Sequence, residues 1–305
     1  MKIGQLIKKR YKVIRLLGAG NMGSVAEVED IQVGTHFAVK EISQAILATA
    51  GSFDAFKKEA AILNSLNHEN LVQYRLFETE KGIHYIFTSL VAGQSLEQSI
   101  ENGHNFSEKD AVTIIIQVLH GLSHAHSKGV VHRDMKPSNI MWNGKTAVVI
   151  DFGIARSGGS VGGMTQAIFA GAYTPHFGAP EQIGSSSPDP RNDIYAVGVT
   201  MYDMITDGMV YGAIHGGHRR FPQMPADRLV RDSVDSLPGI SKGLETILMK
   251  ATSVALHGRY ASADQMIEAL ETLTLGGTPA VGVPSATPSG KKTTRPKSKW
   301  DIRRT

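Results

Sequence analysis

A stretch of 22 residues, His132 to Gly153, constrains this chain more than any other part of the sequence. It reads H-R-D-M-K-P-S-N-I-M-W-N-G-K-T-A-V-V-I-D-F-G, and four of its side chains suit a phosphate or a metal ion: Asp134, Lys136, Asn139 and Asp151. The apolar run 147–150 predicts a short strand that delivers Asp151 at its end, where a loop on a rigid support can carry function. Carboxylate and amide oxygens are ligands that Mg²⁺ prefers, so the stretch predicts a phosphate and metal site rather than a solvated polar loop.

A glycine-rich turn lies near the start of the chain. The β-rich segment 11–17 is followed by G-A-G-N-M-G at 18–23 and then by a second β-rich segment, 25–30. In a dinucleotide-binding fold, G-x-G-x-x-G opens a helix, and an acidic residue follows about twenty residues later. Because a strand follows here, the pattern favours a glycine hairpin folded over phosphate groups, with a plain flexible hairpin as the alternative.

Two further segments supply a lysine and a glutamate. Residues 35–40, T-H-F-A-V-K, predict a strand that ends in Lys40. Residues 52–66 carry apolar side chains at helical spacing, which predicts an amphipathic helix that contains Glu59. Glu59 either pairs with Lys40 or stays on a solvated face beside Lys58.

Together these motifs resemble the eukaryotic-type, or Hanks-type, protein kinases. H-R-D and D-F-G stand at a separation typical of that family, with Lys136 and Asn139 between them, and A-P-E follows at 179–181. The sequences H-R-D-M-K-P-S-N-I-M and D-F-G-I-A-R are most similar to those of bacterial serine/threonine kinases. The resemblance covers roughly residues 11 to 275.

The resemblance implies an α+β fold in which one kinase domain, residues 11–275, has two lobes. Residues 11–88 would form a small lobe with an antiparallel sheet and one helix, 89–94 a hinge, and 95–275 a larger, mainly helical lobe. Apolar periodicity and capping signals predict four helices in the larger lobe, at 107–127, 193–206, 243–252 and 262–275. The last of these starts with an S-A-D-Q capping box.

The implied reaction is transfer of the γ-phosphate of ATP to a serine or threonine hydroxyl of a protein substrate, with Mg²⁺ or Mn²⁺ as cofactor. Asp134 would accept or orient the proton of the acceptor, and Lys136 would steady the transferring group. Lys40, held by Glu59, would orient the phosphates of ATP.

The resemblance also implies binding residues. Asn139 and Asp151 would hold the metal, Thr88 would be a small gatekeeper beside the adenine, and Ser95 falls where the family contacts the ribose. The implied nucleotide contacts are Leu17, Gly18, Ala19, Gly20, Gly23, Val25, Ala38, Lys40, Thr88, Ser89, Val91, Ser95 and Met141.

Regulation is expected in the glycine-rich segment that follows Asp151. Arg133 precedes the catalytic aspartate, and an arginine there implies an anionic partner such as a phosphorylated side chain. Thr165 is the candidate phosphorylation site, and Thr174 lies in the loop that faces the substrate. Residues 172–173 stand before Thr174 where the family usually has glycine, so this loop is expected to differ in shape.

Two contacts within the larger lobe are implied as well. Asp193 would hold the backbone of the H-R-D loop, and Arg259 would pair with Glu181. The stretch 208–240 matches no part of the family pattern and predicts an irregular surface loop.

Composition and charge narrow the remaining possibilities. The chain has no cysteine, which excludes disulfides and thiolate chemistry. It shows neither the roughly 18 consecutive apolar residues of a membrane span nor an N-terminal signal sequence, so we expect a soluble, cytoplasmic protein. The net charge is +4, but residues 276–305 hold seven basic residues and one acidic residue, which leaves about −2 on residues 1–275. The tail is rich in Gly, Pro, Ser, Thr and Lys and is predicted to be disordered.

Other functions are weaker interpretations. A pseudokinase scaffold is disfavoured because no landmark residue is replaced, and a nucleic-acid role rests only on the basic tail, whose one aromatic residue is Trp300. His120 and His124 have the spacing of zinc ligands on a helix, but H-E-x-x-H is missing and no third ligand is evident. A homodimer for autophosphorylation is compatible with the resemblance, although no residue specifies one.

Overall fold

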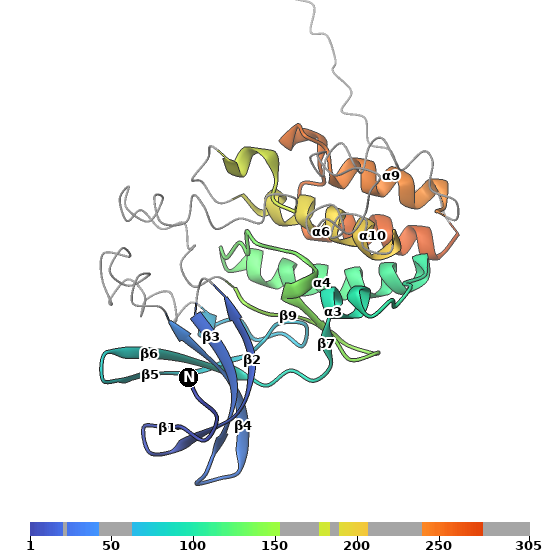
Figure 1. Cartoon of the computed structure of the whole chain (residues 1–305). Helices are drawn as coiled ribbons and strands as arrows, with labels where there is room; N and C mark the ends of the chain where they lie inside the picture. The colour runs from blue at the N-terminus through green and yellow to red at the C-terminus, as the bar shows by residue number, and fades with distance from the viewer. Residues whose placement is uncertain (21–22, 43–62, 153–176, 184–188, 207–239, 277–305) are drawn as a thin grey trace, which may run out of the picture.

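The computed structural model describes residues 1–20, 23–42, 63–152, 177–183, 189–206 and 240–276. They form two lobes, a β-sheet lobe at the N-terminal end of the chain and a mainly helical lobe (Figure 1). The α+β, two-lobed architecture expected from the sequence is therefore confirmed. The predicted helix 52–66 lies outside the described residues up to residue 62, and the predicted loop 208–240 lies outside them up to residue 239.

The smaller lobe is one antiparallel sheet with the strand order β1-β2-β3-β4-β6-β5. Its strands are β1 (Leu6–Ile7), β2 (Tyr11–Gly20), β3 (Gly23–Asp30), β4 (Thr35–Ile42), β5 (Tyr74–Glu80) and β6 (Ile83–Ser89). Gly20 pairs with Gly23 across the glycine turn, so the predicted order of strand, glycine turn and strand is confirmed.

The apolar residues of this sheet form their own core because successive side chains on a strand point to opposite faces. Val13, Val28 and Phe87 are fully buried in it. Within the first ten residues, β1 pairs with β2 in the same sheet. Ile7 is fully buried, and the Gly4 N–H donates to the Val13 carbonyl at 2.9 Å.

A second, three-stranded sheet lies where the lobes meet. It contains β7 (Gln94–Ser95), β8 (Ile140–Trp142) and β9 (Ala147–Val149), in that order. The short helix α3 (Leu96–Glu101) follows β7, and the 3₁₀ turn η1 (Pro137–Asn139) precedes β8. The outer edge of β9 is paired with the chain that enters from the smaller lobe. Val149 N–H donates to the Asn70 carbonyl at 2.8 Å, and Val72 N–H donates to the Val149 carbonyl at 2.9 Å.

Within its described residues, the larger lobe contains four long helices: α4 (Glu108–Ser127), α6 (Pro190–Ile205), α9 (Lys242–Ala251) and α10 (Ala263–Thr274). The turns η2 (Pro180–Ile183) and η3 (Leu256–Gly258) precede α6 and α10. Nearly every residue of α6 is buried, and α4, α9 and α10 pack their apolar faces around it (Figure 1). The four predicted helices are confirmed.

Two details of the helix predictions were wrong. Helix α6 begins at Pro190, three residues before the expected start, because the Asp189 side chain caps it and proline is favoured in a first turn. The expected capping box of α10 forms only in part. Ser262 Oγ accepts from Gln265 N–H at 3.3 Å, but Gln265 Oε1 accepts from Ala261 N–H at 3.0 Å.

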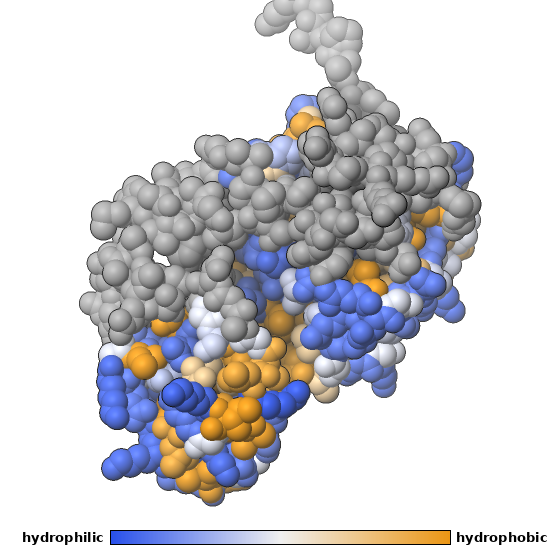
Figure 2. Space-filling view, viewed as in Figure 1, coloured by the Kyte–Doolittle hydropathy of each residue, from blue (hydrophilic) through white to orange (hydrophobic). Residues whose placement is uncertain are grey.

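The surface is polar over most of the visible helical lobe, whereas apolar patches show on the sheet lobe (Figure 2). The exposed large apolar residues of the sheet lobe are Ile3, Leu6, Leu16, Leu17, Ile31 and Val33. None of the helices in the described ranges combines the length and the apolar character needed to cross a bilayer.

Candidate active site

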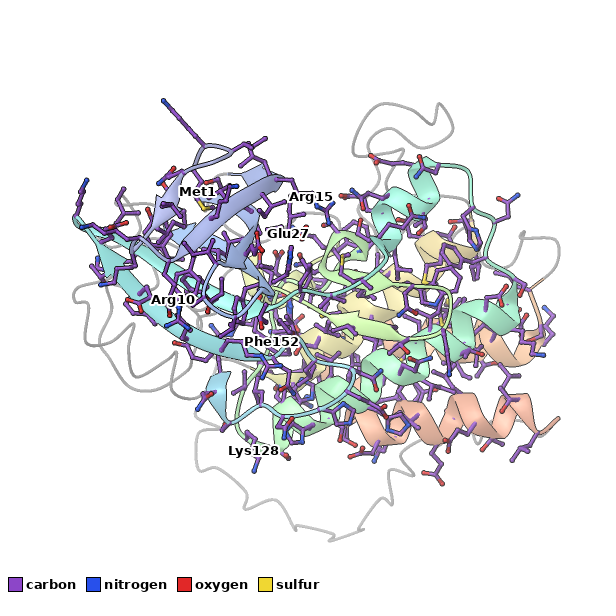
Figure 3. The ribbon with its side chains drawn as sticks, turned by 90° about the horizontal axis from the view of Figure 1, so that it is seen from below. Met1, Arg10, Arg15, Glu27, Lys128 and Phe152 are labelled. Atoms are coloured by element: carbon purple, nitrogen blue, oxygen red, sulfur yellow. The ribbon has the colours of Figure 1, made fainter. Side chains whose placement is uncertain are left out.

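Strand β9 carries Asp151 to the junction of the lobes. Asp151 takes a left-handed φ of 57°, which is an unfavourable conformation for a residue with a Cβ atom. Its neighbours on both sides are fixed by one histidine. His132 Nε2 lies 3.0 Å from the Ile150 carbonyl, and the Phe152 ring packs edge-on against the His132 ring at a centroid distance of 4.7 Å. Phe152 lies near the centre of the molecule (Figure 3).

Asp193 on α6 holds the H-R-D loop by its backbone, as predicted. The fully buried carboxylate accepts from His132 N–H at 2.8 Å and from Arg133 N–H at 2.7 Å, and His126 Nε2 on α4 lies 2.8 Å away. Burial opposes ionisation of Asp193, but the His126 hydrogen bond and the charges of His126 and His132 outweigh it, so the pKa of Asp193 is lowered. A buried anion therefore fixes a loop in which Arg133 has a φ of 66°.

Asp134, Lys136 and Asn139 form one cluster at the end of this loop. Lys136 Nζ lies 3.1 Å from Asp134 Oδ2. Asn139 Nδ2 donates to the Asp134 carbonyl at 2.7 Å and lies 3.4 Å from Asp134 Oδ2. The turn η1 explains the spacing, because it folds Asn139 back over the loop that begins at Asp134. Asp134 is thus presented next to a cation and an amide.

Lys40 on β4 reaches across from the smaller lobe to Asp151. Its Nζ donates to Asp151 Oδ1 at 2.5 Å, and the two side chains are 17% and 40% exposed. Burial would raise the pKa of Asp151, but the charge and hydrogen bond of Lys40, with the charges of His132 and Lys136, lower it overall. Asp151 is therefore an anion at neutral pH.

The donor atoms at this site fit Mg²⁺. Asp151 supplies an ionised carboxylate, and the Asn139 amide nitrogen is committed to Asp134, which directs the amide oxygen to any cation. Mg²⁺ takes one or two carboxylates and keeps its other positions for water and phosphate. Among the residues that the structure describes, no group of three His, Asp or Glu side chains is placed to hold a metal by itself. With so few protein ligands, the cation would take its remaining ligands from phosphate and water oxygens.

Several of the predicted nucleotide contacts lie on adjacent strands. Val25 on β3 pairs with Lys40 on β4, and Ala38 on β4 pairs with Thr88 on β6. Gly18 on β2 pairs in turn with Val25. The other predicted nucleotide contacts that lie on strands of this sheet are Leu17, Ala19, Gly20, Gly23 and Ser89. These positions make a continuous wall from the glycine turn to β6.

Residues 90–93, most of the predicted hinge 89–94, connect β6 to β7. Ser95 pairs with Met141, so two predicted contacts share the β7–β8 ladder. The Ser95 hydroxyl also accepts from Gln98 N–H at 3.1 Å and thereby caps α3, which the ribose prediction did not foresee. Gly93 has a φ of 102°, and a Cβ there would lie 2.2 Å from the Trp142 carbonyl oxygen. Only glycine fits that crossing, which fixes the path of the hinge past Val91.

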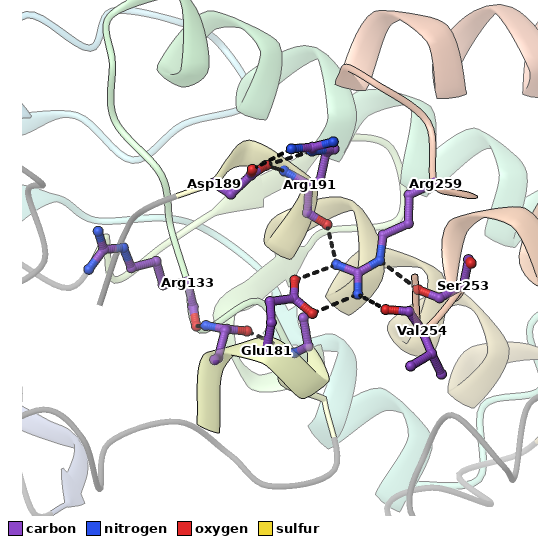
Figure 4. Close-up of polar contacts among 9 residues, drawn as sticks. Arg133, Glu181, Asp189, Arg191, Ser253, Val254 and Arg259 are labelled. Carbon is purple, nitrogen blue, oxygen red and sulfur yellow. Dashed lines mark hydrogen bonds and ion pairs between the residues drawn. The ribbon is translucent and has the colours of Figure 1, made fainter. Parts of the chain in front are cut away.

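Glu181 and Arg259 form the predicted ion pair below the site (Figure 4). Arg259 Nη1 and Nη2 donate to the two Glu181 carboxylate oxygens at 2.7 and 2.8 Å. The guanidinium also donates to the carbonyls of Ser253 and Arg191 and lies over the Tyr195 ring. The A-P-E turn is thereby anchored to the segment that precedes α10.

Sequence reasoning missed some residues that support the site. Gln182 Nε2 donates to the Arg133 carbonyl at 3.0 Å, although no local pattern distinguishes this glutamine from a surface residue. Asn70 and Gln117 tie the start of β9 in place, since Asn70 Nδ2 donates to the Ala147 carbonyl and Gln117 Oε1 accepts from Ala147 N–H. Their side chains are amides drawn from separate elements, so spacing along the chain carries no signal for them.

His68 lies close to His124, which together with His120 has the spacing of zinc ligands on a helix. The rings of His68 and His124 are 5.5 Å apart, and burial together with the charges of His124 and His120 lowers the pKa of His68.

Three predicted site residues lie outside the described ranges. Glu59, Thr165 and Thr174 belong to segments 43–62 and 153–176, so the Lys40 pairing with Glu59 and both regulatory assignments stay predictions.

The comparisons with known proteins agree with this geometry. Residues 11–269 match the family described as "Protein kinase domain". The serine/threonine-protein kinase pkn3 of Myxococcus xanthus is 32% identical over 274 residues, which cover 86% of this chain and 49% of pkn3. The serine/threonine-protein kinase PrkC of Bacillus subtilis is 30% identical over 278 residues, which cover 89% of this chain and 42% of PrkC. The chain therefore spans about half, or less, of the length of these curated relatives.

A solved structure shares the fold. The crystal structure of the Mycobacterium tuberculosis PknI kinase domain superposes with a TM-score of 0.65 at 22% identity and covers 89% of this chain and 98% of the PknI chain. The family match extends over both lobes and includes every described residue of the site. This chain belongs to the Hanks-type protein kinase family, and the relatives that it resembles are bacterial serine/threonine kinases.

Proposed function

We propose that this chain is an active serine/threonine protein kinase that transfers the γ-phosphoryl group of ATP to a protein hydroxyl. One observation carries the proposal. Lys40 from the smaller lobe meets Asp151, while Asp134, Lys136 and Asn139 form a contiguous cluster beside it. Phosphoryl transfer needs charge neutralisation and positioning more than covalent chemistry, and this set of side chains supplies both.

Each side chain has a distinct task. Asp134 orients the acceptor hydroxyl and takes its proton, and the neighbouring Lys136 neutralises charge on the group in transit. Lys40 binds the phosphates of ATP. Asp151 and Asn139 are the residues that would hold Mg²⁺, and a bound Mg²⁺ would neutralise phosphate charge and fix the phosphate oxygens.

Specificity for serine and threonine is supported by Lys136 and by the relatives. Lysine two residues after the catalytic aspartate is typical of serine/threonine kinases, and pkn3 and PrkC are named as such enzymes. Thr174, before Pro175, is the second feature and remains a prediction.

The test is transfer from radiolabelled ATP, with Mg²⁺ present, to myelin basic protein as a generic acceptor. Asp134→Asn keeps the size of the side chain and one acceptor oxygen but removes the base, so we expect a fall in kcat of about 10²- to 10⁴-fold. Asp151→Asn should shift activation of the reaction to higher Mg²⁺ concentrations, because it removes a carboxylate ligand. Full transfer by Asp134→Asn would refute the proposal, and so would an inactive wild-type protein that binds ATP normally.

We also propose control by phosphorylation of the segment after Asp151, with Thr165 as the first candidate site and Ser157 and Ser160 behind it. Arg133, whose backbone is fixed by Asp193, is the cation proposed to receive the phosphate. Mass spectrometry of fully active protein that carries no phosphate between residues 151 and 181 would rule this out.

The proposed partners are protein substrates, and a second copy of the chain is proposed for autophosphorylation. Because ATP is an intracellular substrate, the proposed site of action is the cytoplasm. A linear dependence of the specific autophosphorylation rate on protein concentration would support transfer between copies, whereas a constant specific rate would contradict it.

A further inference from the structure

The Gln182 side chain makes hydrogen bonds to both the A-P-E turn and the H-R-D loop. It lies in η2, directly after the Glu181 that pairs with Arg259, so its backbone is anchored. Its Oε1 accepts from Ala179 N–H at 2.8 Å, and its Nε2 donates to the Arg133 carbonyl at 3.0 Å. One primary amide thus joins the A-P-E turn to the H-R-D loop. Figure 4 shows Arg133 and Glu181, which belong to these two segments.

The bond to Arg133 acts on the peptide that leads into Asp134. The carbonyl of that peptide accepts from Gln182, and its N–H, which belongs to Asp134, lies 3.3 Å from His132 Nδ1. Both polar ends of one peptide plane are therefore held by side chains. Because this plane sets the direction of the Asp134 Cα–Cβ bond, its rotation would move the Asp134 carboxylate.

The backbone at Arg133 is held in an unfavourable conformation. Arg133 has a φ of 66°, which a non-glycine residue keeps only when its surroundings impose it. Asp193 holds the N–H of Arg133 at 2.7 Å, and Gln182 holds its carbonyl. Loss of the Gln182 bond would let the backbone relax towards a negative φ, and Asp134 would turn with it.

We propose that Gln182 is a positioning residue for Asp134. The inference rests on the proposed kinase function, but it concerns the geometry of the catalytic loop and also has a readout that needs no activity. The amide meets both demands at any pH near neutrality, since it accepts from one backbone N–H and donates to one backbone carbonyl, whereas an ionised carboxylate can only accept.

The kinetic test compares Gln182→Glu with Gln265→Glu. Gln265 is the matched control because its Oε1 also accepts from a backbone N–H, that of Ala261 at 3.0 Å, at the distant start of α10. Ionised glutamate at position 182 cannot donate to the Arg133 carbonyl, so we expect kcat to fall about tenfold at about pH 8 with little change in KM for ATP. A protonated glutamate can donate, and the facing Arg133 carbonyl would favour this neutral form and raise the pKa of the introduced carboxyl above the usual value of about 4.3. The ratio of the variant's kcat to that of wild type should therefore rise as the pH falls from about 8 to about 5. A purely structural role predicts no such recovery.

Hydrogen exchange gives the second readout. In Gln182→Ala, peptides that cover Asp134 and Ala179 should exchange faster than in wild type, whereas Gln265→Ala should leave both unchanged. The inference is overturned if Gln182→Glu follows Gln265→Glu at every pH, or if exchange at Asp134 is the same in Gln182→Ala and wild type. An inactive wild-type protein would refute the kinase proposal instead, and hydrogen exchange would still decide the role of Gln182.

Discussion

The pair of Arg259 and Glu181 gives the sharpest prediction of stability. The Arg259 side chain is 0% exposed and that of Glu181 is 29% exposed. Arg259→Ala removes a bidentate bond and leaves the Glu181 carboxylate without its partner. It also removes donors from the carbonyls of Ser253 and Arg191, which lie 2.7 and 3.1 Å from the guanidinium.

The expected loss is large because one charge stays partly buried without compensation. Breaking such a pair from one side costs about 3–5 kcal/mol, whereas exposed pairs contribute little. The free energy of unfolding of Arg259→Ala should therefore be lower by about 4 kcal/mol, a large part of the roughly 5–15 kcal/mol that stabilises a typical domain. For a domain of this size, that corresponds to a fall in Tm of about 8–16 °C.

Equilibrium urea denaturation of the whole chain measures this loss, and Lys8→Ala is the matched control. Lys8 Nζ lies 3.3 Å from Glu78 Oε2, and the Glu78 side chain is 30% exposed, close to the 29% of Glu181, but the Lys8 side chain is 42% exposed. Solvent screening should make its removal nearly neutral. The reasoning fails if Lys8→Ala destabilises the protein as much as Arg259→Ala does, because burial of the cation would then not determine the cost.

Two further predictions test the hinge and the catalytic loop. Gly93→Ala combines a φ of 102° with a Cβ 2.2 Å from the Trp142 carbonyl oxygen, so it should lower the free energy of unfolding by about 2 kcal/mol or more; an unchanged urea midpoint would contradict this. Asp193 has a lowered pKa, so its stabilising effect is complete above the unfolded value of about 3.9 and is lost as the pH falls through the folded pKa. The destabilisation caused by Asp193→Asn should therefore shrink as urea denaturation is repeated from about pH 6 down to about pH 3, and a constant difference would show that Asp193 does not titrate.

The order of elements could be predicted from the sequence because each signal is local. Alternating apolar residues on either side of a glycine turn gave β2 and β3, and apolar periodicity behind a serine cap gave α4 and α10. The catalytic cluster was also predictable, since Asp134, Lys136 and Asn139 lie within one short loop and turn.

Contacts between distant segments could not be predicted from such local signals. The two that were expected, Asp193 with the H-R-D loop and Arg259 with Glu181, were implied by the family resemblance. Lys40 and Asp151 are 111 residues apart, and sequence reasoning paired the lysine with Glu59 without foreseeing its contact with this carboxylate. The bond between Gln182 and the Arg133 carbonyl spans 49 residues. The pairing of β9 with the chain at 70–72 was missed for the same reason, since the partner is neither a neighbouring strand nor a hairpin. These contacts depend on how elements that are far apart in the chain pack together.

The residues that carry the chemistry also depart from local conformational preference. Arg133 and Asp151 both have a positive φ, and neither residue type favours that region as glycine does. In each case, neighbouring contacts resist relaxation. Asp193 and Gln182 hold the two ends of Arg133, and Lys40 holds the Asp151 side chain. A sequence that followed backbone preference alone would place glycine at both positions and would lose the arginine and the carboxylate. The fold instead keeps the functional side chains, and the buried hydrogen bonds of the larger lobe stabilise the unfavourable backbone.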